Sequence, residues 1–353
     1  MTMASRPDVK TASTATTVFA LAGLAAQLLN ALASVPFRRP WRGRASTLHN
    51  VGITVTRSVM RAFLGYATSL PTPEFRSVEN VLDRLCRVVL PPFLRPLDIV
   101  MDDAEVGGVR GLWYRRGNVE PRGTILYLHG GGYIGTSPAM YTISTGRIAA
   151  ETGCEIFAPD YRLAPEFPFP ASLVDAAAVY QGMLDAGTRP DRLFLAGDSG
   201  GGGLVNALML DPLSRALPRP AGLILISPEV SLTLEERSIT DNAALDILPW
   251  NIPVWPYLHG LDSRHPLVSA IDADLHGFPP TFVSLGGDEM FRDGIRGFVE
   301  RLKASDVDAT AIEEPGMFHV FPLLMPWADA SARVYRAIGE FVTTRLARAA
   351  RRP

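Results

Sequence analysis

The sequence is poor in cysteine and carries almost no net charge. Its two cysteines, Cys86 and Cys154, are far apart and match no paired-thiol or metal-ligand spacing, so we expect both to be packed thiols. With 34 basic and 36 acidic residues the net charge is −2, which gives no indication of a nucleic-acid partner. The chain also shows no internal repeat and no low-complexity block.

What the chain does have is apolar residues in quantity. They make up 47% of its 353 residues, enough for a sizeable buried core and too many for a chain that is disordered throughout. This length fits either one large α/β domain with an appendage or two modest domains. We favour the first.

The amino-terminal segment, residues 1–45, has a pattern of its own. No charged residue occurs from 11 to 37, and arginines crowd residues 38–44 directly behind. Three interpretations stay open: a marginal membrane span, because about 20 apolar residues are needed, a signal peptide cleaved near 31–33, or a helix lying on a surface. The arginines oppose export and can attract acidic lipids. We therefore expect a protein that is cytoplasmic, or membrane-associated with its catalytic domain on the cytoplasmic side.

The rest of the chain alternates between helix-like and strand-like segments. Residues 46–97 repeat apolar positions at helical spacing and are interrupted at Pro71 and Pro73. From 98 to 350, short apolar runs typical of buried parallel strands alternate with helical stretches, which predicts an α/β fold with a mostly parallel central sheet flanked by helices. The strand-like runs are 111–114, 123–128, 155–158, 193–196, 222–226 and 281–285. The helical stretches are 171–184, 202–209, 294–304 and 329–348.

A glycine-flanked serine follows one of these runs. Residues 197–201 read Gly-Asp-Ser-Gly-Gly between a strand and a helix, which is the G-x-S-x-G setting of a nucleophile elbow with Ser199 as the nucleophile. The glycines permit a turn in which larger side chains would clash. The following helix aims amide N–H groups and the positive end of its dipole at a developing oxyanion.

A second glycine-rich segment, His129-Gly130-Gly131-Gly132, ends the run at 123–128. Without Cβ atoms its backbone N–H groups can approach a substrate carbonyl, as in the oxyanion holes of esterases and lipases. It lacks the spacing of a dinucleotide or P-loop motif, so phosphate binding is disfavoured. We expect His129 to brace this loop rather than to act as a base.

Histidine and carboxylate candidates lie near the carboxyl end, in the chain order Ser, acid, His that this fold uses. His319 stands in a short loop before the helical stretch 329–348 and is the candidate base. Asp288 and Glu289 both follow the run at 281–285, and the residues alone leave the choice between them open. Asp293 is expected to cap the next helix.

Together these segments resemble the hormone-sensitive lipase family of α/β-hydrolases, which includes bacterial carboxylesterases and arylacetamide deacetylases. The resemblance covers residues 100 to 345, and its further matching segments are 160–166, 169–171, 266–269 and 277–281. It implies that Gly131, Gly132 and Gly200 supply the oxyanion N–H groups and that residues 46–97 belong to a helical cap. The family has alanine where this chain has Gly200. Aligning the family's acid segment on Asp293 favours Glu289 over Asp288 as the acid.

These features predict a serine carboxylic-ester hydrolase acting on short- to medium-chain acyl esters, small molecules or lipids, without metal or organic cofactor. Two alternatives remain: an amidase or deacetylase working on N-acyl or O-acetyl groups, and a ligand receptor that has kept the fold without turnover. The resemblance also implies a homodimer.

Overall fold

One mixed sheet organises the molecule, and the computed structural model describes it through residues 9–37, 46–249 and 252–351. Its eight strands lie in the order β1-β2-β4-β3-β5-β6-β7-β8. β2 runs antiparallel to both of its neighbours, and all pairs from β4 to β8 are parallel. The strands are β1 (Ile99–Val106), β2 (Val109–Arg116), β3 (Thr124–Leu128), β4 (Glu155–Pro159), β5 (Leu193–Asp198), β6 (Gly222–Ile226), β7 (Thr281–Gly286) and β8 (Ala309–Glu314).

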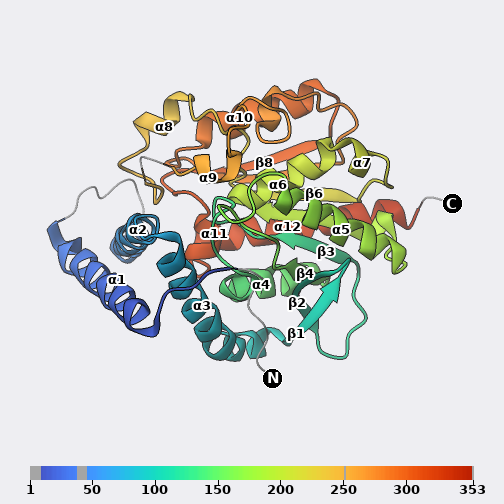
Figure 1. Cartoon of the computed structure of the whole chain (residues 1–353). Coiled ribbons are helices and arrows are strands. Elements are labelled where there is room, and N and C mark those ends of the chain that lie inside the picture. Colours follow the sequence, from blue (N-terminus) through green and yellow to red (C-terminus); the bar gives the residue numbers. More distant parts are fainter. Residues whose placement is uncertain (1–8, 38–45, 250–251, 352–353) are drawn as a thin grey trace.

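Helices cover both faces of this sheet (Figure 1). The α-helices are α1 (Thr14–Ser34), α2 (Thr47–Ala67), α3 (Thr72–Val89), α4 (Thr142–Thr152), α5 (Ala171–Asp185), α6 (Ser199–Leu210), α7 (Pro212–Arg215), α8 (Arg237–Asp241), α9 (Trp255–Leu258), α10 (Arg292–Ala304), α11 (Phe321–Leu324) and α12 (Asp329–Ala349). Short 3-10 turns occur at η1 (Val35–Phe37), η2 (Pro91–Leu97), η3 (Pro138–Tyr141), η4 (Pro190–Arg192) and η5 (Ala270–Asp272).

Strand side chains alternate between two cores because successive residues of a strand point to opposite faces. In β3, Leu126 and Leu128 join the core under α5, α6 and α10, while Ile125 and Tyr127 join the core under α4 and α12. Both faces are therefore covered, which explains why β3, β5 and β6 are buried throughout and mostly apolar. The predicted α/β-hydrolase sheet with flanking helices is confirmed.

Strands β1 and β8 and helix α4 are among the elements that were not predicted from sequence. Strands β1 and β8 mix half-buried and exposed positions and include several acidic residues, since each lies at an edge of the sheet. Helix α4 is rich in small polar residues and lacks a clear apolar period. In addition, α6 begins at Ser199 itself and not at residue 202, so the serine opens the helix.

The amino-terminal helices α1, α2 and α3 pack on one another beside the sheet, with α1 outermost (Figure 1). Ala20 and Leu24 of α1 contact Val78 of α3 in a small core, and the Tyr66 hydroxyl of α2 donates to the Ala20 carbonyl at 2.9 Å. The segment Thr14–Phe37 is long and apolar enough to cross a membrane. Only 17% of its most apolar 18-residue stretch is buried inside the protein. The arginines at 38–44 lie outside the described residues.

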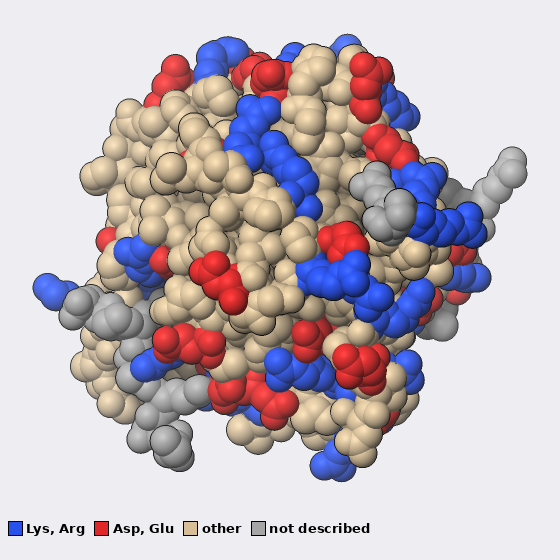
Figure 2. Space-filling view, turned by 90° about the vertical axis from the view of Figure 1, so that its right-hand side faces the viewer, with Lys and Arg blue, Asp and Glu red and all other residues tan. Residues whose placement is uncertain are grey.

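The molecular face on the right of Figure 1 carries charges of both signs. Figure 2 shows Lys and Arg side chains interspersed with Asp and Glu over this face, separated by uncharged areas. Ion pairs such as Arg296 with Glu313 and Arg345 with Asp308, each at 2.6 Å, illustrate this mixing elsewhere on the chain.

Candidate active site

Ser199 occupies a strained turn between β5 and α6. Its φ is +50°, a left-handed conformation that is rare outside glycine, and its side chain is half-buried. A Cβ at residue 201 would lie 2.0 Å from the Leu128 carbonyl oxygen and 2.4 Å from that of His129. Glycine at 201 therefore lets the elbow press against the end of β3, where the second glycine-rich segment begins.

His319 lies opposite this serine. Its Nε2 is 2.9 Å from Ser199 Oγ, hydrogen-bond distance, although 120 residues separate the two in the chain. The imidazole is 1% exposed and meets the ring of Phe291 edge-on at 5.0 Å between centroids. This arrangement lets Nε2 accept the serine proton.

Of the two predicted carboxylates, the structure brings Glu289 to His319. Its Oε2 lies 3.8 Å from His319 Nδ1 and accepts hydrogen bonds from Ser227 Oγ at 2.7 Å and from Gly286 N at 3.1 Å. Within the described residues, Glu289 Oε1 and His319 Nδ1 are both buried and neither has a hydrogen-bond partner. A shift of about 1 Å would bring Nδ1 within hydrogen-bond distance of the carboxylate.

Asp288 lies elsewhere. It is half-buried, its backbone N–H donates to the Met317 carbonyl at 2.9 Å, and no hydrogen bond or ion pair joins it to His319 among the described residues. The prediction that Asp293 caps the next helix is wrong. Phe291 is the N-cap of α10, and Asp293 lies in the first turn, where its carboxylate accepts from Ser238 N and pairs with Arg292.

Burial and the neighbouring carboxylates shift the pKa of His319 in opposite directions. Burial lowers the pKa of the imidazole, but the negative charges of Glu289, Asp246 and Asp198 outweigh burial and raise that pKa above its ordinary value. Carboxylates nearby favour the imidazolium, the form that His319 takes after it has accepted a proton.

Asp246 is a neighbour that sequence reasoning missed. It is fully buried; its Oδ1 accepts from His319 N at 2.8 Å, and its Oδ2 accepts from Met290 N at 2.6 Å. One side chain thus ties the loop of the histidine to the loop of Glu289. No motif marks it, because it lies in an irregular segment between α8 and α9.

Helix α2 reaches the same segment. Arg61 Nη1 donates to the carbonyl oxygens of Ala243 and Asp246, and Arg57 donates to that of Leu245. Helix α2 is therefore bonded to residues 243–246, and the Asp246 side chain of that segment accepts a hydrogen bond from His319 N.

The glycine-rich loop adopts backbone conformations suited to glycine. Gly131 has φ +112° and Gly132 has φ +60°, and a Cβ at 131 would lie 2.3 Å from the Gly135 carbonyl oxygen. Gly200, the second residue of α6, faces this loop, since a Cβ there would lie 3.3 Å from the Tyr133 ring and backbone nitrogen. The structure thus brings the three predicted glycines together beside Ser199.

Asp198 fixes this loop to the elbow and was also missed. Its Oδ1 accepts from Gly130 N at 2.9 Å and from the Tyr127 hydroxyl at 2.8 Å. Burial raises the pKa of Asp198 to about 6, although these hydrogen bonds lower it. Asp198 is part of the G-x-S-x-G motif, but the motif does not predict that its side chain accepts a hydrogen bond from the glycine-rich loop.

His129 is packed as expected for a bracing residue. Its ring stacks on Tyr161 at 4.3 Å between centroids, and its Nδ1 lies 2.9 Å from both Thr136 Oγ1 and the Gly130 carbonyl oxygen. The ring is fully buried.

Arg76 of α3 anchors the other side of the loop. This buried guanidinium donates to the Ile134 carbonyl at 2.8 Å and to the Ala164 carbonyl at 2.6 Å, and it forms ion pairs with Glu79 and Glu166.

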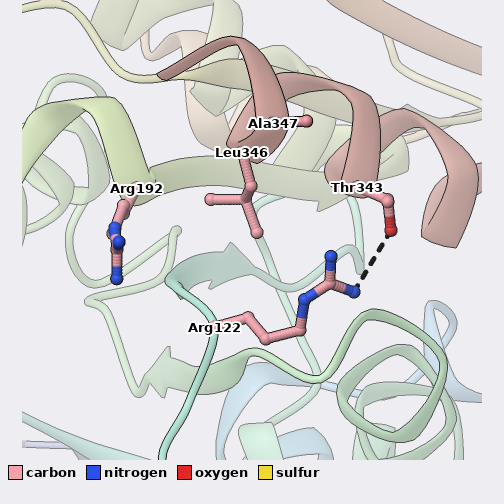
Figure 3. Close-up of a pocket in the computed structure, with 5 residues that line it drawn as sticks. All are labelled: Arg122, Arg192, Thr343, Leu346 and Ala347. Carbon is pink, nitrogen blue, oxygen red and sulfur yellow. Dashed lines mark hydrogen bonds between the residues drawn. The ribbon is translucent and has the colours of Figure 1, made fainter. Parts of the chain in front are cut away.

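A surface pocket of about 310 Å³ lies away from this site (Figure 3). Arg122 and Arg192 line it together with Leu346 and Ala347 of α12, and Arg122 donates to Thr343 Oγ1 at 3.2 Å. Arg122 and Arg192 precede β3 and β5, whereas Ser199 follows the carboxyl end of β5. In such sheets reactive groups gather at the carboxyl ends of strands, so this pocket is separate from the candidate active site.

Both cysteines are free thiols, buried at Cys154 and half-buried at Cys86. Across residues 9–37, 46–249 and 252–351, no group of three or more His, Cys, Asp or Glu side chains is placed to hold a metal ion.

Comparisons with known proteins place this chain among hydrolases. A family described by the α/β-hydrolase fold matches residues 125–323. An acetyl-hydrolase of Streptomyces hygroscopicus is 35% identical over 247 residues, 69% of this chain and 82% of that protein. An esterase of Acinetobacter venetianus is 29% identical over 294 residues, 82% of this chain and 95% of the relative.

Solved structures give the same result. An esterase from the bacterial hormone-sensitive lipase family superposes with a TM-score of 0.74 at 31% identity, covering 86% of this chain and all of that one. The esterase EstE5, soaked with p-nitrophenyl butyrate, superposes with a TM-score of 0.68 at 32% identity, covering 76% of this chain and 98% of that one.

Proposed function

Because this chain belongs to the hormone-sensitive lipase family of α/β-hydrolases and is an ester-hydrolysing enzyme, we propose that Ser199, His319 and Glu289 form its catalytic triad. The observation that carries this proposal is the 2.9 Å contact between Ser199 Oγ and His319 Nε2 at the carboxyl end of β5. Glu289, whose Oε2 lies 3.8 Å from Nδ1, would hold the imidazole in the tautomer that leaves Nε2 free to accept a proton.

The reaction proceeds in two halves. His319 takes the proton of Ser199 as Oγ attacks the ester carbonyl, and it then returns that proton to the departing alcohol, leaving an acyl-serine. Water activated by the same imidazole attacks the acyl-serine and releases the carboxylic acid and free Ser199. No step requires an organic cofactor or a metal ion.

The backbone N–H groups of Gly131, Gly132 and Gly200 stabilise the oxyanion in both halves. The positions of these residues support this role. The loop glycines with positive φ face the first turn of α6, and Asp198, directly before α6, is joined to the loop by the hydrogen bond that it accepts from Gly130 N. N–H groups fixed before the reaction need no reorganisation when charge develops.

We assign short- to medium-chain acyl esters as the substrates. The similar esterase soaked with p-nitrophenyl butyrate supports this range. The test is a p-nitrophenyl series from acetate to palmitate on the wild type and on Ser199→Ala. We expect hydrolysis strongest between acetate and octanoate and lost in the variant. Equal rates for both proteins, or a preference for palmitate, would contradict the assignment.

Acetyl groups are a second candidate because one relative is an acetyl-hydrolase. The chemistry at Ser199 is the same for an O-acetyl ester and an N-acetyl amide, but the amine that leaves from the amide is harder to expel than the alcohol that leaves from the ester. Matched phenyl acetate and acetanilide separate the two. We expect the ester to be cleaved and the anilide left intact, and a faster anilide would make the enzyme an amidase.

We further propose that α1 meets a lipid surface. Phe19 and Leu29 of α1 are 78% and 67% exposed, Phe37 of the following turn η1 is 87% exposed, and arginines at 38, 39, 42 and 44 follow in the sequence. Such a helix lies in the interface and keeps the catalytic domain on the cytoplasmic side. Cosedimentation with vesicles containing phosphatidylglycerol tests it: wild type should bind and Phe19→Ser/Leu29→Ser should bind less. Equal binding, or none by the wild type, contradicts it.

A homodimer is proposed through the edge strand β8, which has no neighbouring strand on its outer side among the residues that the structure describes. Sedimentation equilibrium should give twice the chain mass. A monomer mass at every concentration tested would contradict this.

A further inference from the structure

A buried carboxyl group beside Ser199 is not used by the reaction described above. Glu229 follows β6 and is 3% exposed, and its backbone N–H donates to the Ser199 carbonyl at 2.9 Å. Within the described part of the chain, no hydrogen bond or ion pair reaches its carboxyl group. Burying a carboxyl without a partner is costly, so this position calls for an explanation.

The surroundings of Glu229 belong to the active site. A Cβ at residue 203, in the first turn of α6, would lie 2.2 Å from the Tyr133 hydroxyl and 2.7 Å from the Glu229 carbonyl oxygen. Tyr133 directly follows the oxyanion glycines, and its ring stacks on Tyr257 at 3.8 Å. The backbone of Glu229 therefore lies next to Ser199 and close to Tyr133 at the end of the oxyanion loop.

Several of the charged and titratable groups that interact with the Glu229 carboxyl also belong to the region around Ser199. Burial raises the pKa of Glu229 to about 8, His319 lowers it, and Glu236 raises it. A charge on Glu229 in turn raises the pKa of Tyr133 and of Tyr257. The group is within electrostatic reach of the proposed base, His319, and of the two tyrosines.

A structural role does not account for this arrangement. The buried carboxyls of Asp246 and Asp198 brace this site by accepting hydrogen bonds from backbone N–H groups. Among the described residues, no backbone N–H donates to the carboxyl of Glu229.

Resting on the ester hydrolysis proposed above, we propose that Glu229 is a specificity-determining residue whose carboxyl takes a hydrogen-bond donor, a hydroxyl or an amine, on the acyl part of the substrate. The substrate class is then short acyl esters with a polar substituent near the carbonyl. An extended alkyl chain in the same place would leave the carboxyl buried against hydrocarbon and is disfavoured.

The test compares isosteric substrates. The p-nitrophenyl ester of 3-hydroxybutyrate is paired with that of 3-methylbutyrate, and 2-hydroxybutyrate with 2-methylbutyrate, so that each pair differs by a hydroxyl in place of a methyl. We expect the wild type to favour the hydroxy ester in kcat/KM for at least one pair. Glu229→Leu should reduce that preference by about tenfold, the order of one hydrogen bond to a buried group.

Two variants separate a contact from a packing effect. Glu229→Gln keeps an acceptor and should retain most of the preference. Glu236→Gln removes the other carboxylate that shifts the pKa of Glu229, at the N-cap of α8, and should leave the preference unchanged. Thermal melts show that each variant is folded.

A wild type that prefers the methyl ester in both pairs overturns this inference, even if Glu229→Leu does not fold. An unchanged preference in folded Glu229→Leu overturns it as well. Ester hydrolysis itself is measured on p-nitrophenyl acetate. If the wild type cleaves acetate while the preference is absent, the role of Glu229 fails and the proposed function stands.

Discussion

Asp246 holds the backbone N–H of His319 at 2.8 Å, so the position of the proposed base depends on a carboxylate 73 residues away in the chain. The other oxygen of this carboxylate holds Met290 N, next to Glu289. Because each oxygen of this buried carboxylate accepts from a different loop, Asp246 fixes the distance between the loop of His319 and the loop of Glu289. Asp246 is therefore a positioning residue rather than a catalytic one.

Replacing Asp246 tests this role. Asp246→Ala leaves the N–H groups of His319, Met290 and Ile247 without acceptors, which we expect to lower the free energy of unfolding by about 3 kcal/mol or more, measured with urea. Asp246→Asn keeps one acceptor but removes the charge, so the pKa of His319 should fall and the acid limb of the rate profile should move to lower pH. A folded Asn variant with an unmoved profile would contradict the electrostatic part.

The wild-type pH profile follows from the same charges. Neutral His319 is the active base, and its pKa lies above the ordinary 6.5 because nearby carboxylates outweigh burial. As pH falls through that raised pKa the base becomes protonated, so kcat/KM should fall to half of its plateau above pH 6.5. A midpoint below 6.5, read from initial rates with p-nitrophenyl acetate, contradicts the predicted direction.

Adjacent carboxylates allow a matched comparison. Glu289→Gln should reduce kcat by about 10²- to 10⁴-fold, because the imidazole loses the carboxylate that orients it and stabilises its charged form. Asp288→Asn, one residue away and half-buried, should change kcat by less than about threefold. Reversed effects would assign the acid to Asp288.

The two glycines after the serine should differ in their tolerance of alanine. Gly201→Ala places a Cβ 2.0 Å from the Leu128 carbonyl oxygen, so we expect a loss of about 3 kcal/mol of stability or failure to fold. Gly200→Ala meets the Tyr133 ring only at 3.3 Å, and it should fold with activity within about tenfold of wild type. Thermal melts and p-nitrophenyl acetate rates compare the two, and equal destabilisation would contradict the packing described for the elbow.

The parts of this structure that could be read from sequence are those written in consecutive residues. Continuous apolar runs predicted β3, β5 and β6, because these strands are buried on both faces. The elbow around Ser199 and the loop before Tyr133 were visible for the same reason, since each motif lies in one turn at the end of such a strand.

The parts that could not be read depend on contacts across the chain. Edge strands β1 and β8 carry acidic residues that blur the strand pattern. Asp246 and Glu229 are single acidic residues outside any motif. They can be recognised as part of the site only from their burial and their contacts with His319 and Ser199. The residues alone left the choice between Asp288 and Glu289 open, and the family resemblance favoured Glu289. In the structure it is Glu289 whose Oε2 lies 3.8 Å from His319 Nδ1.

The central claim is that Ser199 is the nucleophile, and covalent labelling tests it most directly. A fluorophosphonate probe, followed by digestion and mass spectrometry, should place one adduct on the peptide containing Ser199 and none on Ser199→Ala. Labelling should be slowed strongly in His319→Ala, which lacks the base 2.9 Å from Oγ. An unlabelled but ester-hydrolysing wild type, or an adduct that persists in Ser199→Ala, would contradict the account.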